Sequence, residues 1–382
     1  MKKDITNVLC DLVNIPTFSA IDENHPIIKY LTENFKDCGE ISIVKGENGN
    51  ANLLIGINTK LNNLQDCVLL SGHIDTVKSS QGHQPKAVVD GENIQGLGAV
   101  DMKAFTASVI DNLEKLKECK TPVVLSLTSD EEYDFYGIEA ILGEMQSRNI
   151  SPKFVVVGEP TKSQFAVSNR GNAIYNITVH GKACHTSNPE LGVNAIVLGS
   201  KIVLEIEKIK EKYKNLATIN IGSMSAGTAP NIVPDLCKFN LSIRTLNLDV
   251  LKQIETDIKT AIDTITVGLP KAEMVSPFSI PPFQQSNNDY ISKVAQKHNV
   301  EITEANFTTE AGPVQQSFPN AEIVVWGPGD PNCIHKAGEQ IDIEELKNYS
   351  RKLGNLIYNY TNQSQKEVFN ENSSKPQDSF CL

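Results

Sequence analysis

Five side chains of the types that bind divalent metals follow apolar runs along this chain or lie in the loops after them. They are His73, Asp101, Glu132, Glu159 and His335. Two histidines and three carboxylates suit a pair of divalent metals that share one bridging carboxylate, with one imidazole and one further carboxylate for each metal. Such a pair keeps positions open for water and substrate.

His73 lies in the segment Gly72-His73-Ile74-Asp75, directly after an apolar run. Side chains alternate along an extended segment, so positions 73 and 75 share one face. Asp75 is therefore placed to hold the His73 ring from outside the metal. The alternative is a histidine at a strand end followed by a turn-forming aspartate.

Asp101 closes a glycine-rich stretch that begins at Gly96. Its two oxygens can reach two metals about 3.5–4 Å apart. A dinucleotide-binding loop is disfavoured, because Asp101 occupies the position of the last glycine and we expect no strand directly before the stretch. Asp101 can also serve as the N-cap of the helix expected from residue 102, and both roles are compatible.

The triplet Asp130-Glu131-Glu132 follows another apolar run. Three adjacent acids repel one another unless they are exposed or neutralised by cations. With metals present, Glu132 can bind one of them while Glu131 holds the attacking water as general base. The alternative for this triplet is a solvated acidic turn. Taken alone, Glu159 could simply lie at the rim of the sheet, and His335 could be a structural histidine. The five candidates together favour the metal pair.

Alternating apolar and helical stretches must position these residues. Expected strands cover residues 67–73, 123–128, 154–157 and 323–326, and expected helices cover residues 102–117, 136–148, 288–296 and 343–360. This alternation predicts an α/β fold with a mostly parallel sheet flanked by helices. Ligands gather at the carboxyl ends of such strands, where the candidate residues fall. Two further helices are expected before residue 36, separated at Pro16.

A different pattern interrupts this domain. Residues 173–282 read as strand, helix, two strands, helix and strand, which is a ferredoxin-like α+β module. We therefore expect residues 1–172 and 283–362 to form one catalytic domain split by an inserted lid and dimerisation domain. Residues 363–382, rich in Gln, Asn, Ser and Lys, are expected to be a flexible tail.

Composition excludes several classes of function. A net charge of −11 without a basic stripe argues against nucleic-acid binding. No apolar run approaches the roughly 20 residues that span a bilayer, so no membrane association is expected. The eight cysteines form no C-x-x-C pair, and no signal peptide precedes them, so we expect a cytoplasmic protein with free thiols.

In their order, these motifs resemble the co-catalytic zinc aminoacylase and metallopeptidase family, over residues 1–362. The resemblance implies a zinc-exopeptidase-like fold with two divalent metals, zinc first and cobalt or manganese as alternatives. By this similarity Asp101 would bridge the metals. His73 and Glu159 would complete one site, and Glu132 and His335 the other. Glu131 would be the general base, and Asp75 the partner of His73.

The inserted module also resembles the family's lid. By this resemblance His185 would reach across a homodimer and stabilise the oxyanion in the partner's active site. Asn231 and Arg244 would contact the substrate carboxylate, for which an Arg fork is suited. The alternatives are an ordinary loop histidine and a surface charge at the end of a strand.

The resemblance implies an amidohydrolase that removes an acyl group, in first place acetyl, from the α-nitrogen of a small amino acid. Residues 308–312 and 325–329 are more similar to the acetylornithine deacetylase branch, whereas residues 334–336 resemble the succinyl-diaminopimelate desuccinylase branch. N-acetylornithine is therefore the first expectation, and a desuccinylase or metallo-dipeptidase the alternative. A non-catalytic binding relative is disfavoured because every expected ligand and the base are present.

Overall fold

The computed structural model describes residues 3–78, 86–285 and 289–362, so the expected tail lies outside the described residues. Two compact units divide the chain. Unit 1 takes in the described residues of Met1–Val167, Gln285–Thr303 and Val314–Leu382, and unit 2 those of Ser168–Gln284 and Glu304–Pro313. Among the described residues, no helix combines the length and apolar character that crossing a membrane requires.

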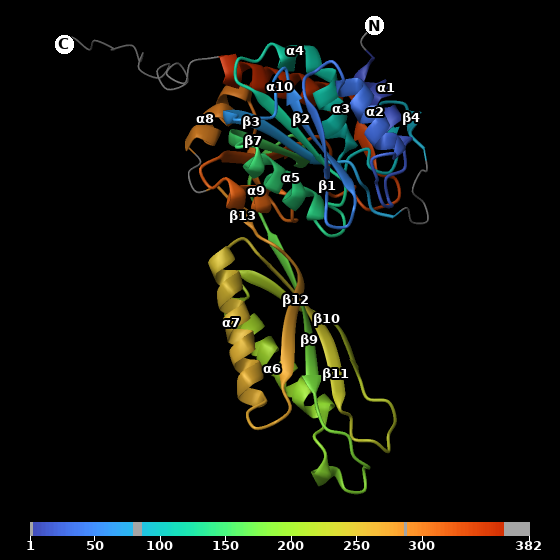
Figure 1. Cartoon of the computed structure of the whole chain (residues 1–382), viewed down its shortest axis with the longest axis vertical. Coiled ribbons are helices and arrows are strands. Elements are labelled where there is room, and N and C mark those ends of the chain that lie inside the picture. Colours follow the sequence, from blue (N-terminus) through green and yellow to red (C-terminus); the bar gives the residue numbers. More distant parts are fainter. Residues whose placement is uncertain (1–2, 79–85, 286–288, 363–382) are drawn as a thin grey trace, which may run out of the picture. The chain divides into compact units, whose positions relative to one another are not determined.

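The large sheet has the order β1-β2-β6-β3-β7-β15-β8-β13, with β14 also paired to β8. Figure 1 labels β1, β2, β3, β7 and β13 of this sheet. Its strands are β1 (Ile41–Lys45), β2 (Ala51–Ile57), β3 (Gln65–His73), β6 (Val123–Thr128), β7 (Ser151–Pro160), β8 (Phe165–Asn169), β13 (Phe283–Gln284), β14 (Ile302–Ala305) and β15 (Glu322–Gly327). The central strands β6, β3, β7 and β15 are parallel. The mostly parallel sheet is thus confirmed, with β1 and β2 added antiparallel at one edge.

The helices of this α/β arrangement are α1 (Ile5–Val13), α2 (Pro26–Phe35), α3 (Lys103–Asp111), α4 (Leu113–Lys117), α5 (Tyr136–Ser147), α8 (Asp289–His298), α9 (Ala311–Ser317) and α10 (Ile343–Asn362). The single helix expected over residues 102–117 is wrong. Asn112 divides it into α3 and α4, because its side-chain amide donates to the carbonyls of Ser108 and Ser350.

Helix α3 approaches the strand ends closely because two glycines make room for it. A Cβ added at Gly158 would lie 2.1 Å from the Phe105 ring, and one added at Gly72 would lie 2.7 Å from Met102. Each glycine directly precedes a candidate ligand, His73 or Glu159. The close packing of α3 therefore fixes the backbone that carries both ligands.

A small antiparallel sheet stands beside the glycine-rich stretch. Its order is β16 (Gln340–Asp342), β5 (Asn93–Gln95) and β4 (Val88–Asp90). The expectation that no strand precedes Gly96 is therefore wrong: three residues of β5 end there, too few to show a periodic pattern. This strand belongs to an antiparallel sheet, so a dinucleotide-binding βαβ unit stays disfavoured.

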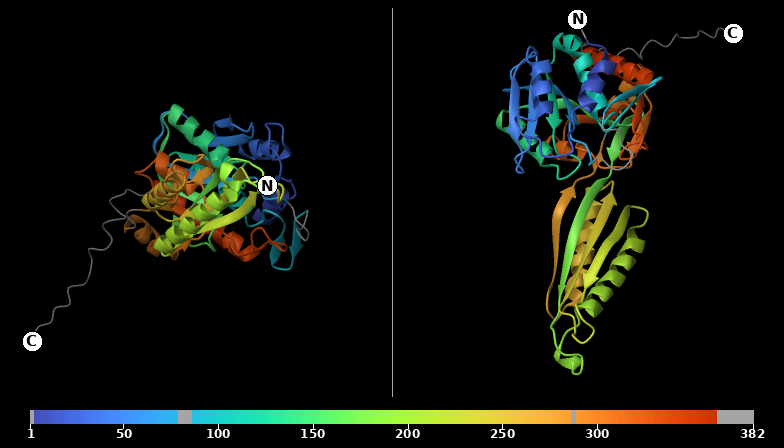
Figure 2. Two further views of the ribbon diagram at one scale, coloured as in Figure 1. Left: turned by 90° about the horizontal axis from the view of Figure 1, so that it is seen from below. Right: turned by 90° about the vertical axis from the view of Figure 1, so that its right-hand side faces the viewer.

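Unit 2 contains a four-stranded antiparallel sheet, in the order β10-β11-β9-β12, within its described residues. Its elements are β9 (Gly171–His180), α6 (Ala195–Tyr213), β10 (Ala217–Ala226), β11 (Leu236–Thr245), α7 (Leu248–Ile265) and β12 (Ala272–Ile280), with a 3₁₀ turn at Pro189–Leu191. Both helices lie on one face of this sheet (Figure 2). The expected ferredoxin-like order is confirmed. Residues 304–313 group with unit 2 instead of the larger domain, because Thr309 donates to Asn169 and Gly312 packs on Pro281.

Candidate metal centre and active site

The metal-binding candidates of unit 1 come together at the carboxyl ends of its parallel strands. His73 ends β3, and Glu159 is the penultimate residue of β7. Glu131 and Glu132 lie in the turn between β6 and α5, and Asp101 lies between β5 and α3. His335 comes from the loop between β15 and β16 and has a left-handed backbone, with φ of 58°. One edge of the sheet thus collects residues that are far apart in sequence.

Asp101 faces both histidines, one with each oxygen. Its Oδ1 lies 3.0 Å from His73 Nε2, and its Oδ2 lies 3.1 Å from His335 Nε2. His335 Nε2 also lies 2.9 Å from Glu132 Oε1, and His73 Nε2 lies 3.6 Å from Glu159 Oε1. The side chains therefore form two groups, each with one histidine and one further carboxylate, joined by Asp101.

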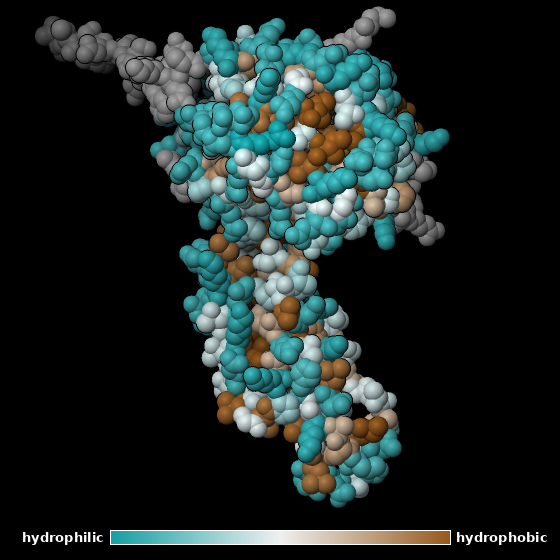
Figure 3. Space-filling model, in the orientation of Figure 1, coloured by the Kyte–Doolittle hydropathy of each residue, from teal (hydrophilic) through white to brown (hydrophobic). Residues whose placement is uncertain are grey.

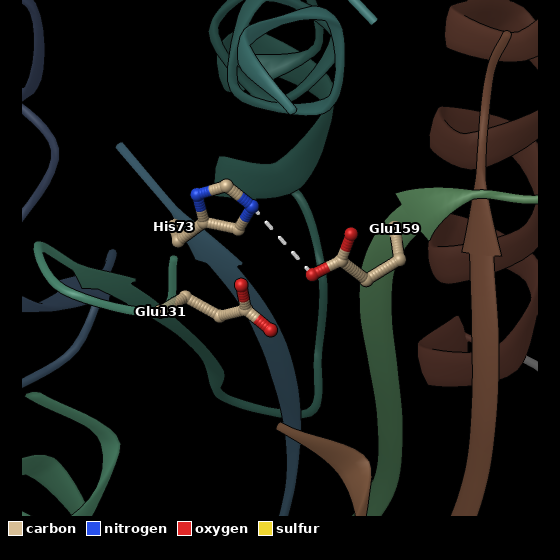
Figure 4. Close-up of side chains that lie close together, drawn as sticks. All are labelled: His73, Glu131 and Glu159. Carbon is tan, nitrogen blue, oxygen red and sulfur yellow. Dashed lines mark ion pairs between the residues drawn. The ribbon is translucent and has the colours of Figure 1, made fainter. Parts of the chain in front are cut away.

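Glu131 lies against the first of these groups. Figure 4 shows its carboxylate pointing into the space between His73 and Glu159, which face each other from neighbouring strands. One ligand atom from each of these three residues lies within 4.8 Å of the other two, and the same holds for His73, Asp101 and Glu132. A carboxylate beside a ligand group in this way can accept a proton from a water held there.

Two aspartates hold the turn that carries Glu131. The buried Asp75 accepts hydrogen bonds from the backbone N–H groups of Glu131 and Glu132, at 3.3 and 3.0 Å. Asp75 also faces His73, whose Nδ1 lies 3.1 Å from the Asp75 carbonyl oxygen and 3.4 Å from its Oδ1. Asp130 accepts from the N–H of Gly137 and from the amide of Asn48. Asp130 is thus a structural anchor of the turn, although it belongs to the acidic triplet.

The electrostatics of the cluster reflect an excess of buried carboxylates. Burial, together with the charge of Glu159, raises the pKa of Glu131 well above its usual range, and burial also raises the pKa of Glu132. Hydrogen bonds to Asp101 and Glu132 raise the pKa of His335 to about 10. Burial alone would lower the pKa of His73, but Glu159 and its other acidic neighbours raise it. The shared cause of these shifts is the close approach of several acidic groups in a buried site.

These residues fit two divalent metals. Imidazole nitrogen and carboxylate oxygen are the ligands that zinc, cobalt and manganese accept, and a bridging carboxylate needs both oxygens directed at the metals. Asp101 has that orientation, because its two oxygens face different histidines. Divalent cations would also offset the charge of the buried acids. The observed donor set is therefore chemically suited to a metal pair.

The other candidate residues belong to unit 2. His185 is exposed, and its Nδ1 lies 2.8 Å from Ser187 Oγ. Its neighbour Thr186 donates through its backbone N–H to the Asn231 carbonyl, so the segment that carries His185 and the exposed Asn231 lie side by side. Arg244 is half-buried in β11, away from that loop pair. Their expected roles stay predictions.

Sequence reasoning gave one alternative that is wrong and missed one residue. Asp101 is not the N-cap of α3; Met102 holds that position, without a side-chain cap, so the Asp101 carboxylate faces the histidines instead. The missed residue is Glu339, which is buried beside the Asp101 loop. Its only signal in the sequence is its place four residues after His335, which predicts no contact.

Comparison with known proteins adds to this geometry. Residues 167–269 match the family described as "Peptidase dimerisation domain". The acetylornithine deacetylase of Buchnera aphidicola subsp. Acyrthosiphon pisum (strain Tuc7) is 30% identical over 374 residues, covering 90% of this chain and 95% of that protein. The acetylornithine deacetylase of Aliivibrio salmonicida (strain LFI1238) is 27% identical over 365 residues, covering 90% and 94%.

Solved structures share the fold. An aminopeptidase PepT from Bacillus cereus superposes with a TM-score of 0.76 at 22% identity, covering 93% of this chain and 97% of that one. A dinuclear metal binding peptidase of the M20 family from Bacillus subtilis gives a TM-score of 0.66 at 16% identity, covering 94% and 97%. Both similarities extend over nearly the whole chain.

Proposed function

The chain belongs to the M20 peptidase family, and from that premise we propose that it is a two-metal amidohydrolase acting on an N-acyl amino acid. The substrate proposed first is N-acetylornithine, cleaved to ornithine and acetate. Relatives named acetylornithine deacetylase, at 27–30% identity over nearly full length, support this choice. The observation that carries the hydrolytic part is the pair of histidines on opposite oxygens of Asp101, with Glu131 beside them.

We propose that His73, Asp101 and Glu159 hold one metal, and that His335, Asp101 and Glu132 hold the other. When bound, the metals would polarise the scissile carbonyl and acidify a water. Zinc is proposed, and the same donor set suits cobalt or manganese. Asp75 is proposed to orient the His73 ring and the acidic turn without binding a metal itself, because its carboxylate contacts both the ring and the backbone of the turn.

Glu131 is proposed as general base and then general acid. Its carboxylate takes a proton from the attacking water as the new carbon–oxygen bond forms. It then returns that proton to the leaving nitrogen as the carbon–nitrogen bond breaks, which yields a carboxylic acid and a free amine. Glu131 thus accepts and returns one proton, so the reaction needs no second acid.

We propose a homodimer formed through unit 2. The match of residues 167–269 to a peptidase dimerisation domain supports it. The unit also exposes large apolar side chains: Leu191, Ile196, Val197, Leu204, Met224, Ile232, Leu236 and Val275. Figure 3 shows apolar surface on one face of this unit. In the dimer, His185 of one subunit would steady the oxyanion in the other, and Asn231 and Arg244 would bind the substrate carboxylate.

The assignment of the base is tested with Glu131→Gln. Glutamine keeps the size of the side chain but cannot accept the proton. Turnover should therefore fall by about 10²–10⁴-fold, the typical contribution of general acid–base catalysis. Metal content, measured by mass spectrometry after gel filtration, should stay at the wild-type level. A variant that retains most of the wild-type rate would contradict the role of Glu131.

A substrate panel tests the specificity. N-acetylornithine, N-acetylmethionine, N-succinyl-diaminopimelate and a dipeptide are each assayed with added zinc or cobalt and with chelator. A chelator-sensitive preference for N-acetylornithine is expected. A peptidase is the second candidate, because the solved structures reported above are named as peptidases. Preferential cleavage of the dipeptide would replace the deacetylase assignment while leaving the metal mechanism intact.

A further inference from the structure

Glu339 accepts hydrogen bonds from four backbone N–H groups of the Asp101 loop, three through its carboxylate and one through its carbonyl. Its carboxylate accepts from the N–H groups of Val100 and Asp101 through Oε1, at 2.8 and 3.1 Å, and from that of Gly98 through Oε2, at 3.1 Å. Its own carbonyl accepts from the N–H of Gly96 at 3.0 Å. Glu339 is 3% exposed, so these bonds are shielded from competing water.

The loop held in this way has little regular structure of its own. Gly98 has φ of +80°, which glycine adopts without strain. Inside the loop, the N–H of Ala99 bonds to the Gly96 carbonyl, and the next such bond joins Lys103 to Gly98. The N–H groups of Gly98, Val100 and Asp101 all converge on one carboxylate. The backbone position of Asp101 therefore depends on Glu339.

The same short segment also carries the second histidine. Glu339 follows His335 by four residues and directly precedes β16, which pairs with β5 in register from Gln340 opposite Gln95. The pairing brings Glu339 level with Gly96, where the glycine loop begins. Residues 335–339 thus supply one side chain facing Asp101 and a second that holds the backbone of Asp101.

We propose that Glu339 is a positioning residue that fixes Asp101 between the two metals, and so sets the affinity for both. The proposal rests on the metal pair of the proposed function. A carboxylate suits the task because it is acceptor-only and its charged hydrogen bonds are roughly twice as strong as neutral ones. A glutamine would turn a donor toward one of the three N–H groups and leave that group unpaired.

The test is metal binding by purified full-length Glu339→Gln, using zinc competition with a chromophoric chelator and cobalt titration followed by visible absorption. Outer-shell changes of this type cost about 10–100-fold in metal affinity, and that loss is expected here for both metals, together with an altered cobalt spectrum. Glu40→Gln is the matched control. Glu40 accepts from the backbone N–H of Leu61 and from Arg148, and it lies outside the candidate ligand groups.

Each outcome of the metal-binding test supports or overturns the positioning role of Glu339. A folded Glu339→Gln with wild-type zinc affinity and cobalt spectrum overturns the proposal and leaves the proposed function intact. A wild-type protein that binds no metal overturns the proposed function, and this proposal with it. Metal binding that is weakened by the variant upholds the positioning role even if no substrate in the panel is cleaved. An equal loss in Glu40→Gln would reduce Glu339 to a general stabilising role and overturn the proposal.

Hydrogen exchange of the metal-free wild-type protein covers the case in which Glu339→Gln does not fold. The amides of Gly98, Val100 and Asp101 are expected to be protected as strongly as those of β3, since their acceptor is already in place without metal. Free exchange of these three amides would overturn the proposal.

Discussion

Each oxygen of Asp101 faces a different histidine, whereas Glu132 and Glu159 each face only one. Burial alone would raise the pKa of Asp101, but its hydrogen bonds to both histidines hold it below the usual range. A substitution of Asp101 is therefore expected to affect both proposed metal positions. A substitution of Glu132 or Glu159 is expected to affect only one.

Asp101→Asn is expected to lose both metals. Asparagine has a single acceptor oxygen and an amide that donates, so it cannot serve two cations. Metal content after gel filtration should fall from two equivalents toward none. Activity should fall by at least about 10–100-fold, which is the loss caused by replacing a residue that only supports a metal ligand. Glu159→Gln, as the matched control, should retain the metal on the His335 side. Two metals retained in Asp101→Asn would refute the bridging role.

For single residues, the sequence predicted that the metal-binding candidates lie close together. It did not predict the hydrogen bonds that fix the loops carrying them. His73, the acidic triplet and Glu159 follow apolar runs, and the edge of a parallel sheet brings such positions together. Glu339 and Asp130 act on backbone N–H groups, including those of Gly98 and Gly137. No residue type marks a backbone donor, so these contacts leave no pattern in the sequence.

At the scale of elements, the long apolar strands and helices were predictable and the short or locally interrupted ones were not. Strand β6 is buried over its whole length and β7 from Phe154 onward, and both contain the apolar runs that predict buried parallel strands. Strands β4, β5 and β16 have three residues each, too few for any periodicity. The break at Asn112 depends on Ser350 in α10, which is a tertiary contact.

Strand β15 begins with Glu322, a half-buried carboxyl group whose pKa is raised to about 7 by burial. In the unfolded chain this group ionises near pH 4.5, so the unfolded state loses the proton first and stability falls as pH rises from about 4.5 to about 7. Glu322→Gln cannot ionise. Its Tm relative to wild type should therefore increase across this interval and level off above it.

Thermal unfolding at several pH values measures this difference. Glu304→Gln removes a carboxyl group at an exposed position of β14 and serves as the control variant. A Tm difference for Glu322→Gln that is equally flat between pH 4.5 and 8 would contradict the burial argument.

At the scale of the whole molecule, the proposed exchange of His185 between subunits can be tested by complementation. Glu131→Gln and His185→Ala should each be inactive as pure proteins. After unfolding and refolding as an equimolar mixture, half of the dimers combine both variants, and one of their two sites contains an intact Glu131 and an intact His185. Activity should then recover to about a quarter of the wild-type value. Mixtures as inactive as their components would contradict a contribution from the partner subunit.

The hydrogen bond between Asp101 and Glu339 spans 238 residues of sequence. During synthesis the amino-terminal part of the chain leaves the ribosome first. Asp101 and its glycine loop are therefore made long before the segment that carries His335 and holds them. Before residues 335–339 are made, the chain lacks one candidate ligand and the carboxylate that holds the Asp101 loop, so firm metal uptake is expected only after this segment has been synthesised. A chain interrupted anywhere before residue 339 would lack this anchor, however complete its sheet.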